Sequence, residues 1–248
     1  MSRDTQATPP GYPPIGAYGI VGNCRAAALI SERGSVDWLC WPRFDSPSTF
    51  GALLDRERGG RFHLCPVGPF KTSRRYLPDT NVLETTFETA GGALRLIDLM
   101  PVATEEEKRR HLWPDHQLLR VLDCLSGEVE VQLTFEPRPG YGAVRPKLRA
   151  HGALGLFYED GGAALTLESD LPIEAARDRS GAHARARLHA GERRYAALSY
   201  SEHIPAILSP PGGEAEASIR RTCAWWRQWL SRCSYHGPWA DQVRRSAL

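Results

Sequence analysis

The sequence predicts a mainly β protein: a large antiparallel β-sandwich, followed by a C-terminal linker helix and the start of a further helix. From residue 15 to about residue 210, short runs of alternating apolar and polar residues are separated by Gly, Pro, Asp or Ser. A parallel sheet would need helical crossovers between these runs, and their spacing leaves no room for them. After Pro210-Pro211-Gly212-Gly213, the apolar residues change to helical spacing.

The first predicted hairpin joins residues 25–30 to residues 36–41, with Gly34 in the loop at the position that needs a positive φ. Both faces of the second strand carry large apolar side chains, so we expect it to be covered on both sides. Strict alternation would give one face with Val36, Trp38 and Cys40 and another with Asp37, Leu39 and Trp41. We expect one short helical turn at residues 49–55.

Later segments repeat the hairpin pattern. Residues 81–89 alternate with period two, turn at a Gly-Gly pair and return as residues 93–100. A further hairpin is predicted between residues 116–124 and 129–135, with its turn at residues 126–128. The remaining strands are expected at residues 154–158, 163–168, 183–188 and 195–200.

The C-terminal segment has the apolar spacing of a helix. A first stripe, at positions i, i+4, i+7, i+11 and i+14, consists of Ile219, Cys223, Trp226, Leu230 and Cys233. His236-Gly237-Pro238 should end this helix, and a second stripe begins with Trp239, Val243 and Ala247. This pattern stops in mid-helix, so we expect more sequence after Leu248 in the full-length protein.

These patterns divide the chain into four segments. Residues 1–14 are polar and rich in Pro, which predicts a flexible tail. Residues 15–210 form the predicted sandwich domain and residues 211–236 the linker helix. Residues 237–248 are the beginning of the next helix.

The composition excludes several functional classes. The 31 Lys and Arg residues nearly balance the 29 Asp and Glu residues, so we expect no nucleic-acid partner and no membrane partner. The start of the chain has no apolar segment typical of a secretory signal. The six Cys and eight His residues show no metal-ligand spacing. We therefore predict a cytoplasmic protein with buried thiols, no metal and no cofactor.

The loop after residues 36–41 is the first candidate site. Pro42 ends the strand, and Trp41, Arg43, Phe44 and Asp45 bring aromatic and charged groups together. One interpretation is a self-contained loop, in which Arg43 pairs with a nearby carboxylate and the aromatic rings fill a core. The other is a rim at the mouth of a sugar pocket, where Arg43 presents a planar guanidinium to hydroxyl groups. The residue types alone favour the first.

Trp226, Trp229 and Leu230 form the second candidate, an interface helix. Tryptophans in a row can stack on sugar rings, but Trp226 and Leu230 belong to the apolar stripe of the predicted helix. We therefore expect packing. Part of this surface should be exposed in the chain as it stands, and exposed apolar patches promote self-association.

No residue is predicted to be catalytic. The carboxylates on or beside the predicted strands that could form an acid pair are Asp37, Asp45, Asp98, Glu84 and Glu88. Glu84 and Glu88 are four residues apart on a strand, which separates them too far for the paired carboxylates of an inverting glycosidase. Carboxylates on a half-exposed strand usually belong to the solvated face.

Residues 15–55, IGAYGIVGNCRAAALISERGSVDWLCWPRFDSPSTFGALLD, resemble the opening of bacterial glycoside hydrolase family 15 proteins, the glucoamylase-like and trehalase-like group. The resemblance continues through residues 59–62, 74–78, 81–87 and 98–101, and resumes at 225–226, 235–239 and 243–248. Asn23 stands where that group more often has Asp, and Ala26 where it has Thr.

The resemblance implies an N-terminal β-sandwich that precedes an (α/α) barrel. In that family two glutamates of the barrel, an acid and a base, hydrolyse terminal α-glucosidic bonds with inversion. Residues 237–248 would be the first barrel helix, and both glutamates would lie beyond Leu248. The implied partners are this missing barrel and, in the parent enzyme, an α-glucoside substrate. We expect the chain alone to be inactive.

Two alternatives remain open. The domain can be a stand-alone carbohydrate-binding β-sandwich, which would show an exposed, coplanar aromatic platform. It can also be a structural or regulatory fragment without a ligand. Self-association through residues 219–248 is a separate expectation.

Overall fold

The computed structural model describes residues 12–104, 106–107, 115–152, 155–202 and 215–248. In chain order its elements are η1 (Ile15–Ala17), β1 (Tyr18–Gly22), β2 (Ala27–Ser31), β3 (Ser35–Cys40), β4 (Ser48–Phe50), β5 (Arg61–Pro66), β6 (Lys71–Tyr76), β7 (Leu83–Glu88), β8 (Gly92–Leu99), β9 (His116–Glu136), β10 (Arg149–Ala150), β11 (Leu156–Asp160), β12 (Ala163–Ser169), β13 (Glu174–Ala175), β14 (Ala182–His189), β15 (Arg193–Ser201), α2 (Ala215–Leu230) and α3 (Ala240–Ser246).

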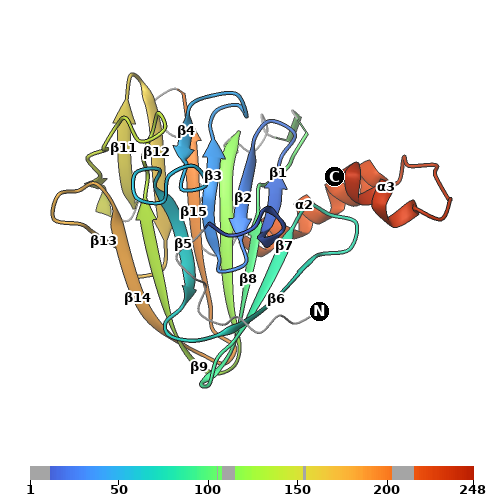
Figure 1. Ribbon diagram of the computed structural model, residues 1–248, viewed down its shortest axis with the longest axis horizontal. Helices are drawn as coiled ribbons and strands as arrows, with labels where there is room; N and C mark the ends of the chain where they lie inside the picture. Colours follow the sequence, from blue (N-terminus) through green and yellow to red (C-terminus); the bar gives the residue numbers. More distant parts are fainter. Residues whose placement is uncertain (1–11, 105, 108–114, 153–154, 203–214) are drawn as a thin grey trace.

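The strands form two layers, and every strand pair in the described ranges is antiparallel (Figure 1). Layer A runs in the order β6, β7, β8, the first part of β9, β15, β12, β11 and β10. Layer B runs in the order β1, β2, β3, β5, the second part of β9, β14 and β13, with β4 paired to β3. The mainly β, antiparallel fold is therefore confirmed.

Strand β9 belongs to both layers, which corrects the hairpin predicted at residues 116–135. Its first part pairs with β8 and β15, and its second part pairs with β5 and β14. The chain does not turn back at residues 126–128. Instead, Leu125 is left out of the register with β8, and Gly127 has a φ of 67°. A positive-φ glycine suits a bulge as well as a turn, so the local sequence predicted the wrong one.

Strand β3 also departs from strict alternation. Its register with β2 shifts so that Leu29 faces Trp38 and Ile30 faces Val36, and Asp37 is therefore the extra residue of a bulge. Val36 and Leu39 consequently point into the same core, whereas alternation had placed them on opposite faces. The expectation that both sides of the strand are covered holds, because five of its six residues are buried.

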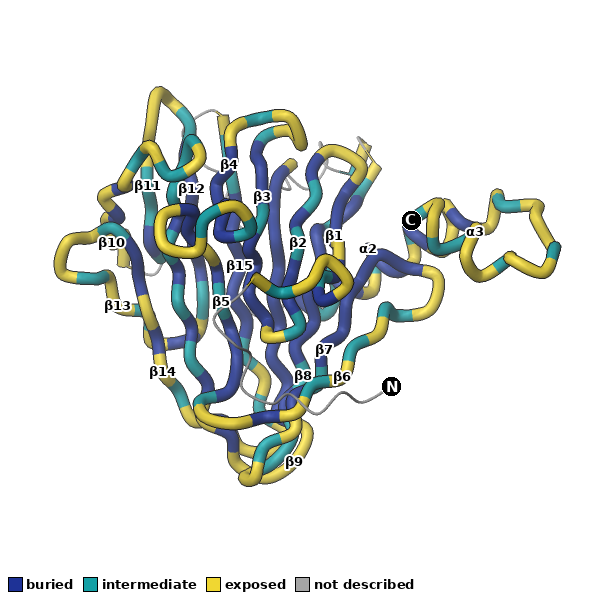
Figure 2. The backbone as a smooth tube through the Cα atoms, viewed as in Figure 1, coloured by how far each residue is buried: buried dark blue, intermediate teal, exposed yellow. Residues whose placement is uncertain are grey.

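The main core lies between the layers. Gly34, in the β2–β3 turn of layer B, approaches Phe87 and Leu96 of layer A so closely that a Cβ there would lie 3.2 and 3.3 Å from their side chains. Its φ of 78° also favours glycine. The rings of Phe50 and Phe62 pack edge to face against Phe135, with centroids 5.9 and 5.6 Å apart. Figure 2 shows the buried backbone running through both layers.

Helix α2 covers part of the outer face of layer A. Its buried residues include Ile219, Cys223, Trp226 and Leu230, which confirms the predicted stripe as far as Leu230. Its last predicted member, Cys233, lies beyond the helix and is only partly buried. A second apolar cluster joins Ala215, Ile219 and Cys223 to Val82, Ile97, Leu99, Leu119, Val121, Tyr195 and Ala197. The helix ends at Leu230, earlier than expected, where the Ser231 hydroxyl donates to the Gln228 carbonyl at 2.8 Å.

The short helical turn, the second C-terminal helix and the N-terminal tail were the remaining predicted features. The segment expected to be a helical turn, residues 49–55, begins inside β4 and continues as turns rather than helix. The second C-terminal helix is present as α3, although none of its residues is buried. Residues 1–11 of the expected tail and residues 211–214 of the expected linker helix lie outside the described residues.

Candidate functional site

Trp41, at the start of the loop after β3, lies in the core between the layers. Its ring centroid is 6.3 Å from that of Tyr200 and 6.4 Å from that of His116, and these two rings meet edge to face at 6.0 Å. Only 4% of Trp41 is exposed. This side chain therefore closes one end of the core and offers no open ring face to a ligand.

The next residues form a loop that satisfies its own polar groups. Arg43 and Asp45, both more than half exposed, form an ion pair with 3.2 Å between Nε and Oδ1. The backbone N–H of Arg43 donates to the Ser46 hydroxyl, and the N–H of Ser46 donates to the Arg43 carbonyl, both at 3.1 Å. Phe44 is 75% exposed, so the interpretation that it fills a core is wrong.

Asp98, a carboxylate at the end of β8, forms a fully buried ion pair with Arg120. Arg120 Nε donates to Asp98 Oδ1 at 2.7 Å, and neither side chain has any exposed surface. Both residues belong to layer A but point into the space between the layers. The remaining guanidinium nitrogens donate to the carbonyls of Phe62 and Gly34 in layer B, at 2.7 and 2.8 Å. This arrangement joins the layers and leaves Asp98 no freedom to act on a substrate.

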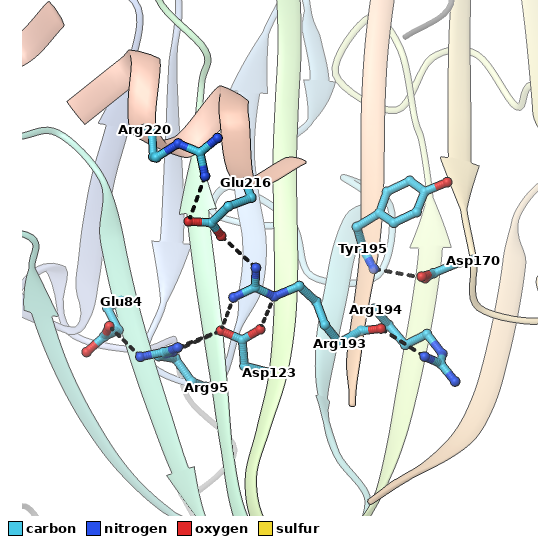
Figure 3. A network of polar contacts seen from close by, with 9 residues as sticks. All are labelled: Glu84, Arg95, Asp123, Asp170, Arg193, Arg194, Tyr195, Glu216 and Arg220. Carbon is cyan, nitrogen blue, oxygen red and sulfur yellow. Dashed lines mark hydrogen bonds and ion pairs between the residues drawn. The ribbon is translucent and has the colours of Figure 1, made fainter. Parts of the chain in front are cut away.

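A series of alternating charges crosses the outer face of layer A, and Figure 3 shows it from Glu84 to Arg220. From the sheet edge inward, its members are Arg75, Glu84, Arg95, Asp123, Arg193, Glu216 and Arg220. Glu84 is buried between Arg75, at 2.6 Å, and Arg95, at 3.7 Å, so the expectation of a solvated carboxylate is wrong for this residue.

Arg193 links this series to the helix. It donates to both carboxylate oxygens of Asp123 on β9 and, through Nη1, to Glu216 of α2 at 2.6 Å. Burial alone would raise the pKa of Asp123, but the hydrogen bonds from Arg193 and Arg95 outweigh it and hold the pKa below its ordinary value. The same hydrogen bonds favour the charged form of the partner, so the pairing with Asp123 raises the pKa of Arg193. These charges therefore stay ionised and fix the start of α2 to the sheet.

Glu168 is a different kind of carboxylate. It lies buried on β12, opposite Ala197 of β15, and its Oε1 makes no hydrogen bond within the described residues. Burial raises the pKa of Glu168 to about 7. The neighbouring carboxylate of Asp170 accepts the backbone N–H of Tyr195 at 2.8 Å, and burial raises its pKa too. Nothing in the sequence pattern singled out Glu168, because alternation predicts only which face it occupies.

The two tryptophans of the interface helix have separate roles. Trp226 and Leu230 are buried, each only 2% exposed. Trp229 is exposed, and its Nε1 donates to the Ala247 carbonyl of the C-terminal segment at 3.0 Å. Trp229 also stacks on Trp225, with centroids 6.0 Å apart and an interplanar angle of 6°. The helix therefore buries one tryptophan and presents the other to the C-terminal segment and the solvent.

Arginines from both helices hold the β6–β7 loop. Arg244 forms an ion pair with Asp79 at 2.7 Å, and Arg227 lies 3.4 Å from the Pro78 carbonyl. Arg245 donates to the Thr80 carbonyl and to the Asn81 side chain, at 3.0 and 3.1 Å. Its guanidinium also stacks 3.3 Å from the ring centroid of Tyr76. Sequence patterns did not predict these contacts, because they join residues more than 140 positions apart.

The described residues contain no group of three or more His, Cys, Asp or Glu side chains placed to hold a metal ion. No helix in the described ranges is long and apolar enough to cross a membrane.

Comparison with known proteins assigns the chain to a family. A family model described as trehalase-like, N-terminal, matches residues 8–195. A trehalase of Mycolicibacterium smegmatis is 37% identical over 256 residues, covering 96% of this chain and 37% of that protein. A trehalase of Mycobacterium tuberculosis is 35% identical over 254 residues, again covering 96% of this chain and 37% of that protein.

An archaeal relative matches over a similar extent. A trehalase of Thermoplasma volcanium is 28% identical over 251 residues, covering 100% of this chain and 39% of that protein. The chain thus spans less than two fifths of the length of these curated relatives. The resemblance to the trehalase-like group is confirmed, and the chain belongs to the trehalase-like, N-terminal family.

Proposed function

We propose that this chain is the non-catalytic β-sandwich domain of a family 15 glycoside hydrolase of the trehalase or glucoamylase type. It supports and caps a catalytic helical barrel that hydrolyses terminal α-glucosidic bonds with inversion. The observation that carries the proposal is the family match over residues 8–195, together with trehalases that extend far beyond the matched region.

The carboxylates of the domain support the expected inactivity of the chain alone. Inverting hydrolysis needs a protonated carboxylic acid and a free carboxylate, roughly 6.5–9.5 Å apart across a sugar. Asp98, Glu84 and Asp123 are each engaged by arginines, and Asp45 pairs with Arg43. Glu168 has a pKa suited to an acid, but the carboxylate of Asp170, just after β12, already accepts a hydrogen bond from the backbone of Tyr195.

In the same proposal the C-terminal helices connect the sandwich to the barrel. Residues 211–236 are the linker, and residues 237–248 correspond to the first barrel helix. The exposed loop at Arg43, Phe44 and Asp45 then lies beside the barrel mouth, where it shapes the sugar pocket or supports the loops that do. The α-glucoside is bound by the complete enzyme.

Glucose release by the purified chain tests the proposal. Trehalose, maltose and maltotriose should all remain intact, while a full-length trehalase assayed in parallel releases glucose. If the chain does release glucose, Glu168→Gln separates its own activity from contamination, because a contaminant would be insensitive to that substitution. Activity that is lost in this variant would overturn the proposal.

A stand-alone carbohydrate-binding module would need an exposed aromatic platform with a free ring face. Trp229, the exposed tryptophan of α2, stacks on the half-buried Trp225, and Arg232 lies 5.4 Å from the Trp229 centroid. Two rings stacked one above the other do not form a coplanar platform, so this pair does not match the surface of a binding module. Retardation of the chain by starch in affinity electrophoresis would favour the binding module instead.

We also propose a cytoplasmic location. All six cysteines are free thiols, four of them buried, which is the usual state in a reducing compartment.

A further inference from the structure

Strand β6, at the edge of layer A, carries an arginine that points into the space between the layers. In the register with β7, Arg74 faces Thr85, which lies between the core residues Leu83 and Phe87 along its own strand. Because alternate residues of a strand share a face, Thr85 and its partner Arg74 point toward the same core. Nη1 of Arg74 donates to the Ile30 carbonyl of layer B at 3.2 Å, as this orientation requires.

The guanidinium of Arg74 is a partly buried charge that forms no ion pair with any residue the structure describes. Glu32 attracts it from beyond ion-pair distance. Burial nevertheless lowers the pKa of Arg74, because this attraction does not offset the loss of hydration. The next residue is different, since Nε of Arg75 lies 2.6 Å from Glu84 on the outer face of the layer. Charges inside proteins are normally paired, so Arg74 lacks a counter-ion.

Two threonine hydroxyls beside Arg74 are unsatisfied as well. Thr85 has no exposed surface, and its Oγ1 makes no hydrogen bond within the described residues. Oγ1 of Thr72, two positions before Arg74 on the same face of β6, is also closed to solvent and has no partner in the described part of the chain. Buried polar groups without a partner are destabilising, and a bound ion or water usually explains them. Three donor groups, one of them charged, are thus neighbours on the inner side of layer A.

Contacts on both sides of Arg74 hold this part of β6 against layer B. On one side the Tyr76 hydroxyl accepts from the Ile20 N–H at 2.9 Å and donates to the Ile20 carbonyl at 3.0 Å. On the other side the guanidinium of Arg33, in the β2–β3 turn, stacks 4.8 Å from the ring centroid of Phe70. The unsatisfied donors lie between these two contacts along the chain. A position enclosed in this way suits a single small ion rather than a large ligand.

We infer that Arg74, Thr72 and Thr85 bind a small inorganic anion of the size of chloride between the two layers. The guanidinium supplies the charge and N–H groups that the bond to Ile30 leaves over, and the two hydroxyls donate to the same ion. A water molecule in this position would satisfy the hydroxyls but would leave the charge of Arg74 without a counter-ion. The anion joins β6 and β7 to the rest of the sandwich, a role that does not depend on the proposed function.

Urea denaturation of the purified chain tests this inference, with chloride replacing gluconate, an anion too large for the site, at constant ionic strength. The unfolding equilibrium constant should decrease and should be about tenfold lower when chloride reaches about ten times its dissociation constant. Arg74→Gln and Thr85→Val should each abolish most of this dependence. The matched controls are Arg75→Gln and Thr86→Val, because these adjacent residues point to the outer face of layer A and should leave the chloride dependence intact.

Line broadening in the chloride NMR spectrum gives a second measurement on the folded proteins. The wild type and both controls should broaden the signal, and Thr85→Val should do so much less, which keeps the test decisive if Arg74→Gln does not fold. A wild-type stability that is independent of chloride would mean that water fills the site, and would overturn the inference. An equal response in all five proteins would show a general salt effect and would overturn it too. The proposed function stands in either case, because no part of it uses this anion.

Discussion

The guanidinium of Arg120 lies 2.7 Å from the carboxylate of Asp98, and neither side chain is reached by solvent. Because Arg120 also donates to two carbonyls of layer B, this single side chain connects three segments of the core. Removing one partner would leave a buried, uncompensated charge. The destabilisation this causes is larger than the net free energy by which the ion pair stabilises the fold.

We therefore expect Arg120→Ala to lower the free energy of unfolding by about 3–5 kcal/mol, or to prevent folding. Urea denaturation followed by tryptophan fluorescence measures the loss. The control is Arg187→Ala, since Arg187 forms an exposed ion pair with Glu128 at 3.1 Å and should change stability by less than about 1 kcal/mol. Equal effects of the two substitutions would contradict a structural role for the buried pair.

Glu168 should make stability fall as the pH rises. Its folded-state pKa of about 7 lies above the ordinary value of 4.5, so between these pH values the folded chain keeps a proton that the unfolded chain releases. The free energy of unfolding should decrease across this window, by about 3 kcal/mol in total, and level off above pH 7.

Urea denaturation at pH 5 and pH 8 compares the wild type with Glu168→Gln, which should remove this dependence and be the more stable protein at pH 8. The exposed Glu159 of the neighbouring strand provides the control variant, Glu159→Gln. A wild-type stability that rises between pH 5 and pH 8 by the same amount in all three proteins would refute the assignment.

The bond from Arg193 to Glu216 should determine how firmly α2 rests on the sheet. In Arg193→Gln we expect the amide hydrogens of α2 to exchange about tenfold faster, because local opening no longer breaks a charge-assisted contact. Arg194→Gln is the control, since Arg194 pairs with Glu192 on its own side of the strand. Equal protection of α2 in both variants would show that the apolar stripe alone holds the helix.

Gly127 should tolerate no side chain. A Cβ at this position would lie 2.0 Å from the Gly91 carbonyl oxygen, in addition to the cost of its φ of 67°. Gly161 has a similar φ of 58°, but a Cβ added there would meet no atom within 4 Å. Gly161→Ala therefore measures only the cost of holding alanine at a positive φ, which is about 1–2 kcal/mol. Thermal melting should show a clearly larger loss for Gly127→Ala, and similar losses would mean that the bulge adapts.

The Arg43–Asp45 pair should matter little for folding. Arg43→Ala is expected to change the unfolding free energy of the chain by less than about 1 kcal/mol, because both side chains are largely exposed. When the domain is part of a complete enzyme, Arg43→Ala and Asp45→Ala should both lower kcat/KM for an α-glucoside. Unchanged kinetics in that enzyme would exclude the loop from the substrate rim.

The sequence was sufficient for features that depend on neighbouring residues. The β2–β3 turn at Gly34 and the buried stripe of α2 follow from local spacing, and both are present. The hairpin predicted within β9 was wrong because the signal at Gly127 is the same for a bulge and a turn. Only the partners of each half of β9 decide between them, and these lie elsewhere in the chain.

In the candidate site, too, the sequence predicted local contacts and missed those between distant residues. Spacing predicted that Trp226 and Leu230 pack and that Arg43 can pair with Asp45, since these contacts are local. The contacts of Arg245 with Tyr76 and of Arg120 with Phe62 join distant residues, and a single sequence carries no record of such pairs.

Strand β9 restricts how the length of this domain can vary in evolution. One inserted residue at 125–127 would shift the register of a strand that both layers share, and a shift by one residue turns inward-facing side chains outward. Insertions and deletions among family members are therefore expected in the connections at the layer edges, while the number of residues between Cys124 and Val129 stays constant.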